Sequence, residues 1–114
     1  MTTVYGIKNC DTVKKALKWL DKQGIAYQFH DLRGDGISKA DLQGWIHSVD
    51  WELLLNRRST TWRQLADKEK TDLNADKAIK LMLANPTLIK RPVISKGKTL
   101  LVGFNEADYK KALN

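Results

Sequence analysis

The sequence has 114 residues, a formal net charge of +7 and a single cysteine. This length suits one domain with its own core, and a single cysteine excludes an internal disulfide. No apolar run is long enough to span a membrane and no secretory leader is recognisable, so we expect a cytoplasmic protein without a membrane partner. The basic residues are interleaved with acidic ones, which favours a solvated basic surface over direct nucleic-acid binding. We also expect a monomer.

The first third of the chain predicts a strand, a helix and a second strand. The apolar run from Val4 to Ile7 is typical of a short buried strand. Apolar residues at helical spacing then predict a helix over residues 11–23, with Gly24 as its C-terminal cap. Alternating apolar residues from Ile25 to Phe29 predict the second strand. These elements form a βαβ unit, so the two strands should be parallel.

Residues 38–85 are predicted to be helical. Ser38 with Asp41 three residues later resembles a capping box. Further helices are expected to start near Trp51, Thr60 and Asn74, with apolar faces that include Leu53, Leu54, Leu55, Ala75, Ala78, Ile79 and Met82.

The last third returns to strands. Residues 93–103 carry a hairpin signal with Gly97 at the tip, and Asn105 opens a C-terminal helix that carries Ala107, Ala112 and Leu113. The order βαβ, helical block, ββα is that of an α/β, thioredoxin-like fold with a four-stranded mixed sheet. We therefore predict one domain over residues 1–114, with a thioredoxin-like core (1–35 and 88–114) and a helical insertion (36–87) between strands 2 and 3.

Cys10 lies where the first strand ends and the first helix begins. The first N–H groups of a helix lack intrahelical partners and the helix dipole is positive there, so both stabilise a thiolate. Such positions lower a cysteine pKa from about 8.5 to between roughly 3.5 and 7.5. Lys8 and Lys14 add positive charge nearby. The competing interpretation is a structural cysteine that packs as a small apolar residue.

Several motifs resemble one known family along the whole chain. They are Tyr5-Gly6-Ile7-Lys8-Asn9-Cys10-Asp11-Thr12, Leu55-Asn56-Arg57, Thr60-Thr61-Trp62-Arg63, Leu81-Met82-Leu83 and Ile89-Lys90-Arg91-Pro92. Together they resemble the arsenate reductase/Spx family, and within it the YffB-like branch. The resemblance implies a thioredoxin-like core, thiol chemistry at Cys10, and a proline, here Pro92, that is usually cis and faces the active cysteine.

The resemblance also indicates which of the activities known in that family fit this sequence. In the glutathione- and glutaredoxin-coupled arsenate reductases three arginines bind the oxyanion. Their positions match Arg91, Asn56 and Gly103 in this sequence, so only one arginine is in place. Spx-type regulators usually carry a Cys-x-x-Cys switch and bind RNA polymerase, whereas here Val13 stands at the second position. YffB-like members are thought to be glutathione-dependent thiol reductases.

We therefore expect a glutathione-dependent thiol oxidoreductase with Cys10 as nucleophile. No second thiol can release Cys10, so glutathione is the expected co-substrate and partner, with glutaredoxin as a second candidate partner. No bound cofactor or metal is expected, because His30 and His47 have no ligand partners at metal spacing. The alternatives are a glutathione/glutaredoxin-coupled arsenate reductase and a non-catalytic, Spx-like protein-binding module.

The substrate-binding residues expected beside Cys10 are Arg91, Asn9, Lys8, Arg57, Arg58 and Pro92. Arg91 could bind a carboxylate or oxyanion through its planar guanidinium, or be a surface residue before a structural proline. Arg57 and Arg58 could instead be solvated loop arginines, and Lys8 and Asn9 could only shape the loop backbone.

Overall fold

The computed structural model describes residues 2–113, and its contacts divide the chain into two units. One unit comprises Met1–Asp35 and Arg91–Asn114, and the other, the helical unit, comprises Gly36–Lys90. That both form one domain stays a prediction. Residues 88–90, which we had placed in the thioredoxin-like part, belong to the helical unit. They do so because Ile89 pairs with Leu55 and the Lys90 N–H donates to the Leu54 carbonyl over 2.7 Å.

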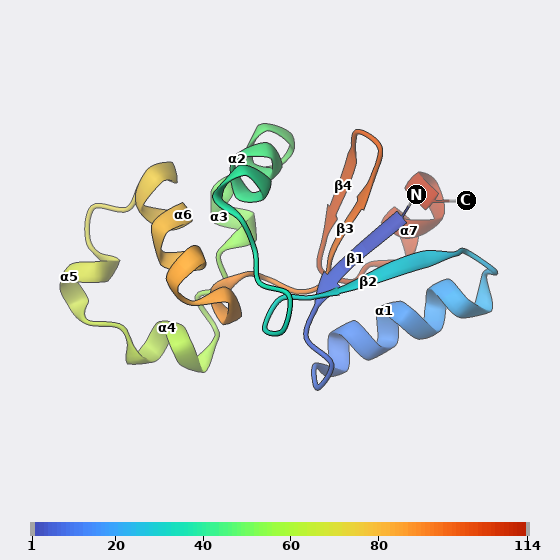
Figure 1. The fold of residues 1–114 in the computed structure, drawn as a ribbon, viewed down its shortest axis with the longest axis horizontal. Helices are drawn as coiled ribbons and strands as arrows, with labels where there is room; N and C mark the ends of the chain where they lie inside the picture. Colours follow the sequence, from blue (N-terminus) through green and yellow to red (C-terminus); the bar gives the residue numbers. More distant parts are fainter. Residues whose placement is uncertain (1, 114) are drawn as a thin grey trace. The chain divides into compact units, whose positions relative to one another are not determined.

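A four-stranded sheet forms the centre of the first unit. Its strands are β1 (Thr2–Gly6), β2 (Tyr27–Asp31), β3 (Val93–Lys96) and β4 (Thr99–Val102). They lie in the order β2-β1-β3-β4 (Figure 1). β1 is parallel to β2 and antiparallel to β3, and β4 is antiparallel to β3. The predicted fold class is therefore confirmed: a mixed sheet of thioredoxin-like order, with helices inserted between β2 and β3.

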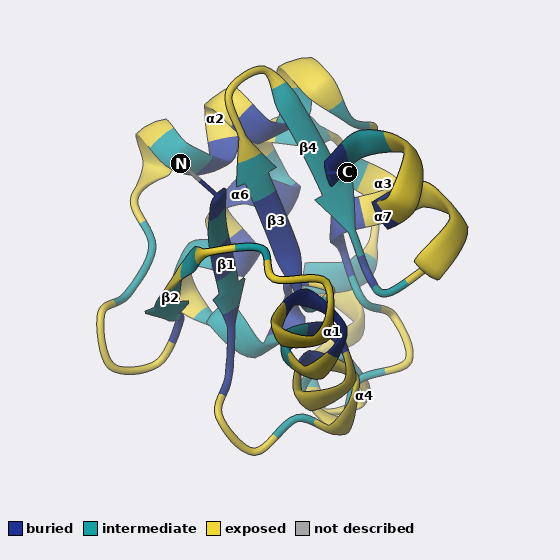
Figure 2. Cartoon of the chain, turned by 90° about the vertical axis from the view of Figure 1, so that its right-hand side faces the viewer, coloured by how far each residue is buried: buried dark blue, intermediate teal, exposed yellow. Residues whose placement is uncertain are grey.

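Helices α1 (Asp11–Lys22) and α7 (Glu106–Leu113) bury their apolar faces in one core with the sheet. Figure 2 shows α1 dark on its inner side and yellow on its outer side. The core consists of Val4, Ala16, Trp19, Leu20, Ile94, Tyr109 and Leu113. Of the apolar residues that we named for this helix, Leu113 is buried and Ala107 is exposed. Tyr109, at 1% exposure, packs in the core with Leu113.

The helical unit contains five α-helices and one 3-10 helix within its described residues. They are α2 (Lys39–Ser48), α3 (Trp51–Leu54), α4 (Thr60–Gln64), α5 (Asp67–Lys70), α6 (Ala75–Ala84) and η1 (Pro86–Leu88). The predicted caps are present, because Ser38 Oγ accepts a hydrogen bond from the Asp41 N–H and Asn74 Oδ1 accepts one from the Lys77 N–H. Leu53, which we expected on an apolar face, is 57% exposed. The short helix α5 was not anticipated.

None of the described helices is both long and apolar enough to cross a membrane.

Gly6 at the end of β1 lies directly against Val13 in the first turn of α1. A Cβ atom at Gly6 would stand 2.9 Å from Val13 Cγ2 and 3.0 Å from Cγ1. Val13 is fully buried, and its branched side chain has few alternative rotamers. The absence of a side chain at Gly6 therefore sets how closely the start of α1 approaches the sheet.

Replacing Gly6 by alanine should destabilise the protein by about 1–3 kcal/mol, the usual cost of adding a methyl group to a filled core. Urea unfolding followed by tryptophan fluorescence measures this. Gly44→Ala is the matched control, because nothing lies within 4 Å of a Cβ at that position in α2. Alanine there should stabilise by about 0.5–1 kcal/mol. Equal stability of Gly6→Ala and wild type would refute the close approach.

Candidate active site

Cys10 is the N-cap residue of α1 and is half-buried. Its backbone is extended, with φ −101° and ψ 123°. The Cys10 N–H donates to the Ile7 carbonyl over 3.3 Å, and the Cys10 carbonyl accepts from the Lys14 N–H over 3.0 Å. The strand, the turn and the helix thus hold the backbone of Cys10 on both sides, while its side chain remains partly open to solvent.

The environment of Cys10 favours the thiolate. Partial burial raises the pKa of the Cys10 thiol, but the Val13 N–H, the Arg91 guanidinium and the Thr12 N–H together outweigh this and lower the pKa below its ordinary value. Arg91 acts both as a hydrogen-bond donor and through its charge. Cys10 is the N-cap residue, so its side chain lies at the positive end of the helix dipole, which stabilises a thiolate.

The positive groups responsible differ in part from those expected. We had counted Lys8, Lys14 and Arg91 as the nearby cations. Among the described residues the lowering of the Cys10 pKa comes from Arg91 and the backbone of the first helical turn, not from these lysines. Lys8 and Asn9 are exposed in the loop before Cys10, and their part in substrate binding stays a prediction.

Arg91 and Pro92 precede β3, and the peptide bond between them is cis, as the family resemblance implied. Pro92 is buried and Arg91 is half-buried. The Pro92 carbonyl accepts a hydrogen bond of 2.8 Å from the Gly103 N–H. The Gly103 carbonyl in turn accepts one of 2.6 Å from the buried Tyr109 hydroxyl. Tyr109, which the sequence analysis missed, therefore anchors the segment that carries Arg91. An aromatic residue one turn into a C-terminal helix was the available signal.

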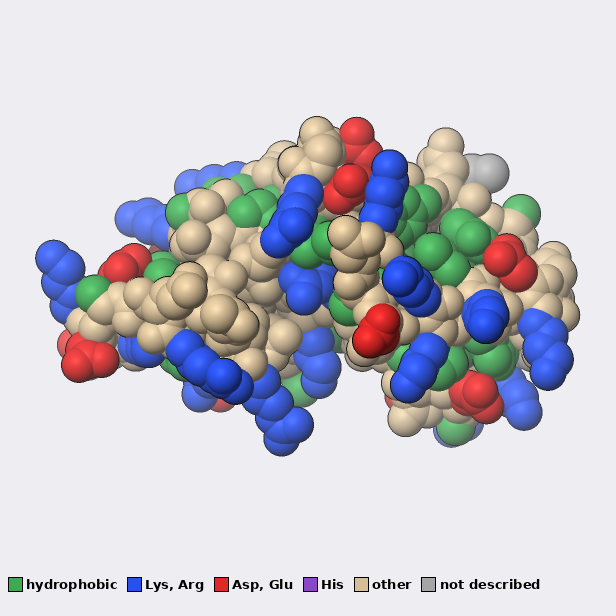
Figure 3. All heavy atoms as spheres, turned by 90° about the horizontal axis from the view of Figure 1, so that it is seen from below, with side chains coloured by type: hydrophobic (Ala, Val, Ile, Leu, Met, Phe, Trp, Pro, Cys, Tyr) green, Lys and Arg blue, Asp and Glu red, His purple; other side chains and the backbone are tan. Residues whose placement is uncertain are grey.

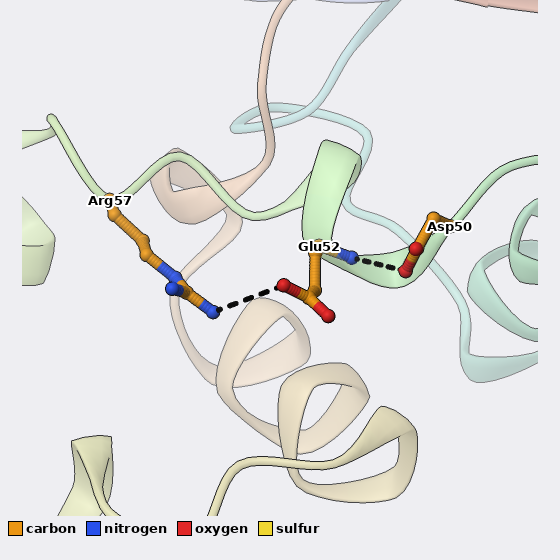
Figure 4. Close-up of polar contacts among 3 residues, drawn as sticks. All are labelled: Asp50, Glu52 and Arg57. Atoms are coloured by element: carbon orange, nitrogen blue, oxygen red, sulfur yellow. Dashed lines mark hydrogen bonds and ion pairs between the residues drawn. The ribbon is translucent and has the colours of Figure 1, made fainter.

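Arg57 and Arg58 lie in the loop after α3 in the helical unit, and both are exposed. Arg57 Nη2 is 4.0 Å from Glu52 Oε2 (Figure 4), and its guanidinium lies 5.8 Å from the centre of the Trp62 ring. Both arginines line a shallow pocket of about 390 Å³ that also includes Lys90. This pocket could hold an anion, and the role of the two arginines in binding substrate stays a prediction.

The local backbone structure suits Asn56 and Gly103, which stand where the family resemblance implies two oxyanion-binding arginines. The Asn56 Oδ1 accepts a hydrogen bond of 3.1 Å from the Arg58 N–H, a turn that an arginine side chain cannot make. Gly103 has a φ of 79°, a left-handed conformation that favours glycine. Asn56 and Gly103 thus each stabilise the local backbone conformation in a way that arginine would not.

Within residues 2–113, no three His, Cys, Asp or Glu side chains gather closely enough to hold a metal ion. His30 instead contacts the Tyr5 ring, with 4.9 Å between ring centres.

The Cys10 thiol should titrate below about 8.5, the ordinary value for a cysteine. Thiolate absorbance against pH measures it. Arg91→Met keeps much of the side-chain length but removes the charge, so it should raise the Cys10 pKa.

Lys14→Met is the matched control, because it removes one charge near Cys10 from a residue that does not contribute to the shift. Its Cys10 pKa should stay close to that of the wild type. An equal rise in both variants would mean that diffuse positive charge, rather than the Arg91 contact, stabilises the thiolate.

Comparison with known proteins agrees with this geometry. The ArsC family model matches residues 5–112. A solved structure of a YffB protein is 47% identical, covers 100% of both chains and superposes with a TM-score of 0.97. An arsenate reductase (ArsC) related protein from Brucella melitensis is 45% identical over 97% of this chain and 92% of its own, with a TM-score of 0.77. The global transcriptional regulator Spx of Streptococcus mutans is 27% identical over 99% of this chain and 83% of its own length. The chain belongs to the ArsC family.

Proposed function

We propose that the protein is a glutathione-dependent thiol oxidoreductase with Cys10 as its single nucleophile. The observation that carries this proposal is a half-buried thiol whose pKa is lowered by Arg91 and the first turn of α1. The thiolate is the form of cysteine that attacks a disulfide, so a lowered pKa increases the reactive fraction at neutral pH. Because Cys10 is the only cysteine in the chain, its adduct must be resolved by a thiol from outside.

The reaction has two exchange steps. The Cys10 thiolate attacks the glutathione sulfur of a mixed disulfide, a Cys10–glutathione bond forms, and the substrate leaves as a thiolate that takes up a proton. The thiolate of a second glutathione then attacks the glutathione sulfur on Cys10. This releases oxidised glutathione and restores the Cys10 thiolate. One substrate sulfur is reduced to a thiol and the sulfur of the second glutathione is oxidised to the disulfide level, so glutathione is the reductant.

Arg91 supports both steps through its charge. Its guanidinium stabilises the Cys10 thiolate before attack and again when Cys10 becomes the leaving group. A leaving thiol of lower pKa departs faster, so the same interaction that activates Cys10 also favours its release. Glutathione acts as a co-substrate rather than a bound cofactor. The same proposal places the protein in the reducing cytoplasm as a monomer, with glutaredoxin as a second candidate donor.

The proposal predicts glutathione-dependent reduction of a small disulfide, such as the mixed disulfide of glutathione with mercaptoethanol. Oxidised glutathione is followed by coupling to glutathione reductase and NADPH. Cys10→Ser should be inactive, and Arg91→Met should be slower than Arg91→Lys because only lysine keeps a charge beside the thiolate. A wild-type rate no higher than that of Cys10→Ser would rule out the activity.

Arsenate reduction, the first alternative, should be poor. Each lost charge-assisted hydrogen bond to the oxyanion costs about 1.5–3 kcal/mol. With Asn56 and Gly103 at two of the three arginine positions, the combined loss of about 3–6 kcal/mol corresponds to about two to four orders of magnitude in rate. The assay uses arsenate, glutathione and glutaredoxin, with a three-arginine arsenate reductase of the family in parallel. Comparable turnover by the two proteins would make arsenate reduction the function.

The second alternative, a non-catalytic module, is motivated by the similarity to Spx over nearly the whole chain. Capture of purified RNA polymerase by immobilised protein tests it. Binding that is unchanged in Cys10→Ser, together with no disulfide reduction by the wild type, would favour this alternative.

A further inference from the structure

The exposed side of α1 carries a row of lysines that the proposed chemistry does not use. Lys15, Lys18 and Lys22 are spaced by three and four residues, so they lie on one face of the helix. Lys110 of α7 lines the same groove as these three. Within residues 2–113 none of the four lysines forms an ion pair. Four positive charges thus line one groove, and none of them is paired with an acidic side chain of the described residues.

The groove between α1 and α7 has a volume of about 590 Å³ and an aromatic lining. Phe104 is half-buried and packs edge-on against Tyr109, with 5.2 Å between ring centres. Trp19, at 7% exposure, packs against the same ring at 5.5 Å. Aromatic and basic side chains therefore line the groove together, and Glu106 is the one acidic residue among its described lining residues. Figure 3 shows the exposed side of α1, where apolar side chains lie between the blue Lys and Arg side chains.

The same helix connects the groove to Cys10. Lys15 follows Cys10 by five residues and Lys22 by twelve, which corresponds to about 7 Å and 18 Å along the helix axis. An extended chain advances about 3.3 Å per residue. A segment of roughly five residues that flanks an oxidised cysteine could therefore lie along the groove while its sulfur reaches Cys10.

We propose that the groove between α1 and α7 binds an acidic segment of the protein whose mixed disulfide Cys10 reduces. The proposal rests on the proposed function for the reaction but adds the class of substrate. Carboxylates of the segment would pair with the four lysines, and an apolar side chain between them would contact Phe104. Nucleic acid fits less well, because the four lysines line one groove of about 590 Å³ and not an extended track for a phosphate backbone.

Two glutathionylated peptides test the proposal. They share one cysteine and differ at four flanking positions, which are glutamate in one and glutamine in the other. At low salt, kcat/KM for the acidic peptide should exceed that for the neutral one by about tenfold. The ratio should fall toward one as salt rises, because exposed charges are screened.

The groove variant is K18E/K22E, which should reduce the ratio of the two kcat/KM values to one or below. Its matched control is K96E/K98E, which changes the net charge by the same amount at the β3–β4 hairpin of the same unit. The control should keep most of the preference. An equal loss in both variants would overturn the proposal, since net charge and not the groove would explain the effect. A ratio near one for the wild type would also overturn it.

A binding measurement that involves no disulfide exchange distinguishes a failure of this proposal from a failure of the proposed function. The probes are the same acidic and neutral peptides with serine in place of cysteine, measured by fluorescence anisotropy against the wild-type protein. Tighter binding of the acidic peptide that K18E/K22E alone removes would support the groove, even if no disulfide were reduced. A labelled DNA duplex that binds in place of the acidic peptide, and is lost only in K18E/K22E, would assign the groove to nucleic acid and overturn the proposal.

Discussion

The contact between Gly6 and Val13 is the constraint on which the candidate site depends. It lets the first turn of α1 lie directly against the end of β1. The N–H groups of Thr12 and Val13 in that turn lower the Cys10 pKa. Partial burial alone would raise the Cys10 pKa and make the thiol less reactive. The helix start and the arginine reverse this effect.

Arg91 and Pro92, the second part of the site, lie far from Cys10 in the sequence. Tyr109 holds Gly103, and Gly103 holds Pro92, through two consecutive hydrogen bonds of the backbone carbonyls. The conformation of Gly103 that permits this is one an arginine would adopt only with strain. The residue that holds the segment of Arg91 thus stands at the position where the family resemblance implies a third oxyanion-binding arginine.

Local patterns predicted most of the fold, because strand alternation, helical spacing and side-chain caps at Ser38 and Asn74 act over a few residues. Short elements were less predictable: α5 has only four residues, too few for a periodic apolar face. Cys10 could be identified because the N-terminus of a helix has known electrostatics. The position of Tyr109 in its helix signalled a buried aromatic residue, but its hydrogen bond to Gly103 could not be predicted because it depends on the tertiary packing. The contributions of Lys8 and Lys14 were overestimated because proximity in sequence did not place their charges on the sulfur.

The central claim is that Cys10 forms a mixed disulfide with glutathione that an external thiol resolves. Intact mass spectrometry after incubation with oxidised glutathione at neutral pH tests it most directly. The account predicts one glutathionyl group per chain on the wild type, none on Cys10→Ser, and full release when reduced glutathione is added. An unmodified wild-type chain, or an adduct that reduced glutathione does not remove, would contradict the account.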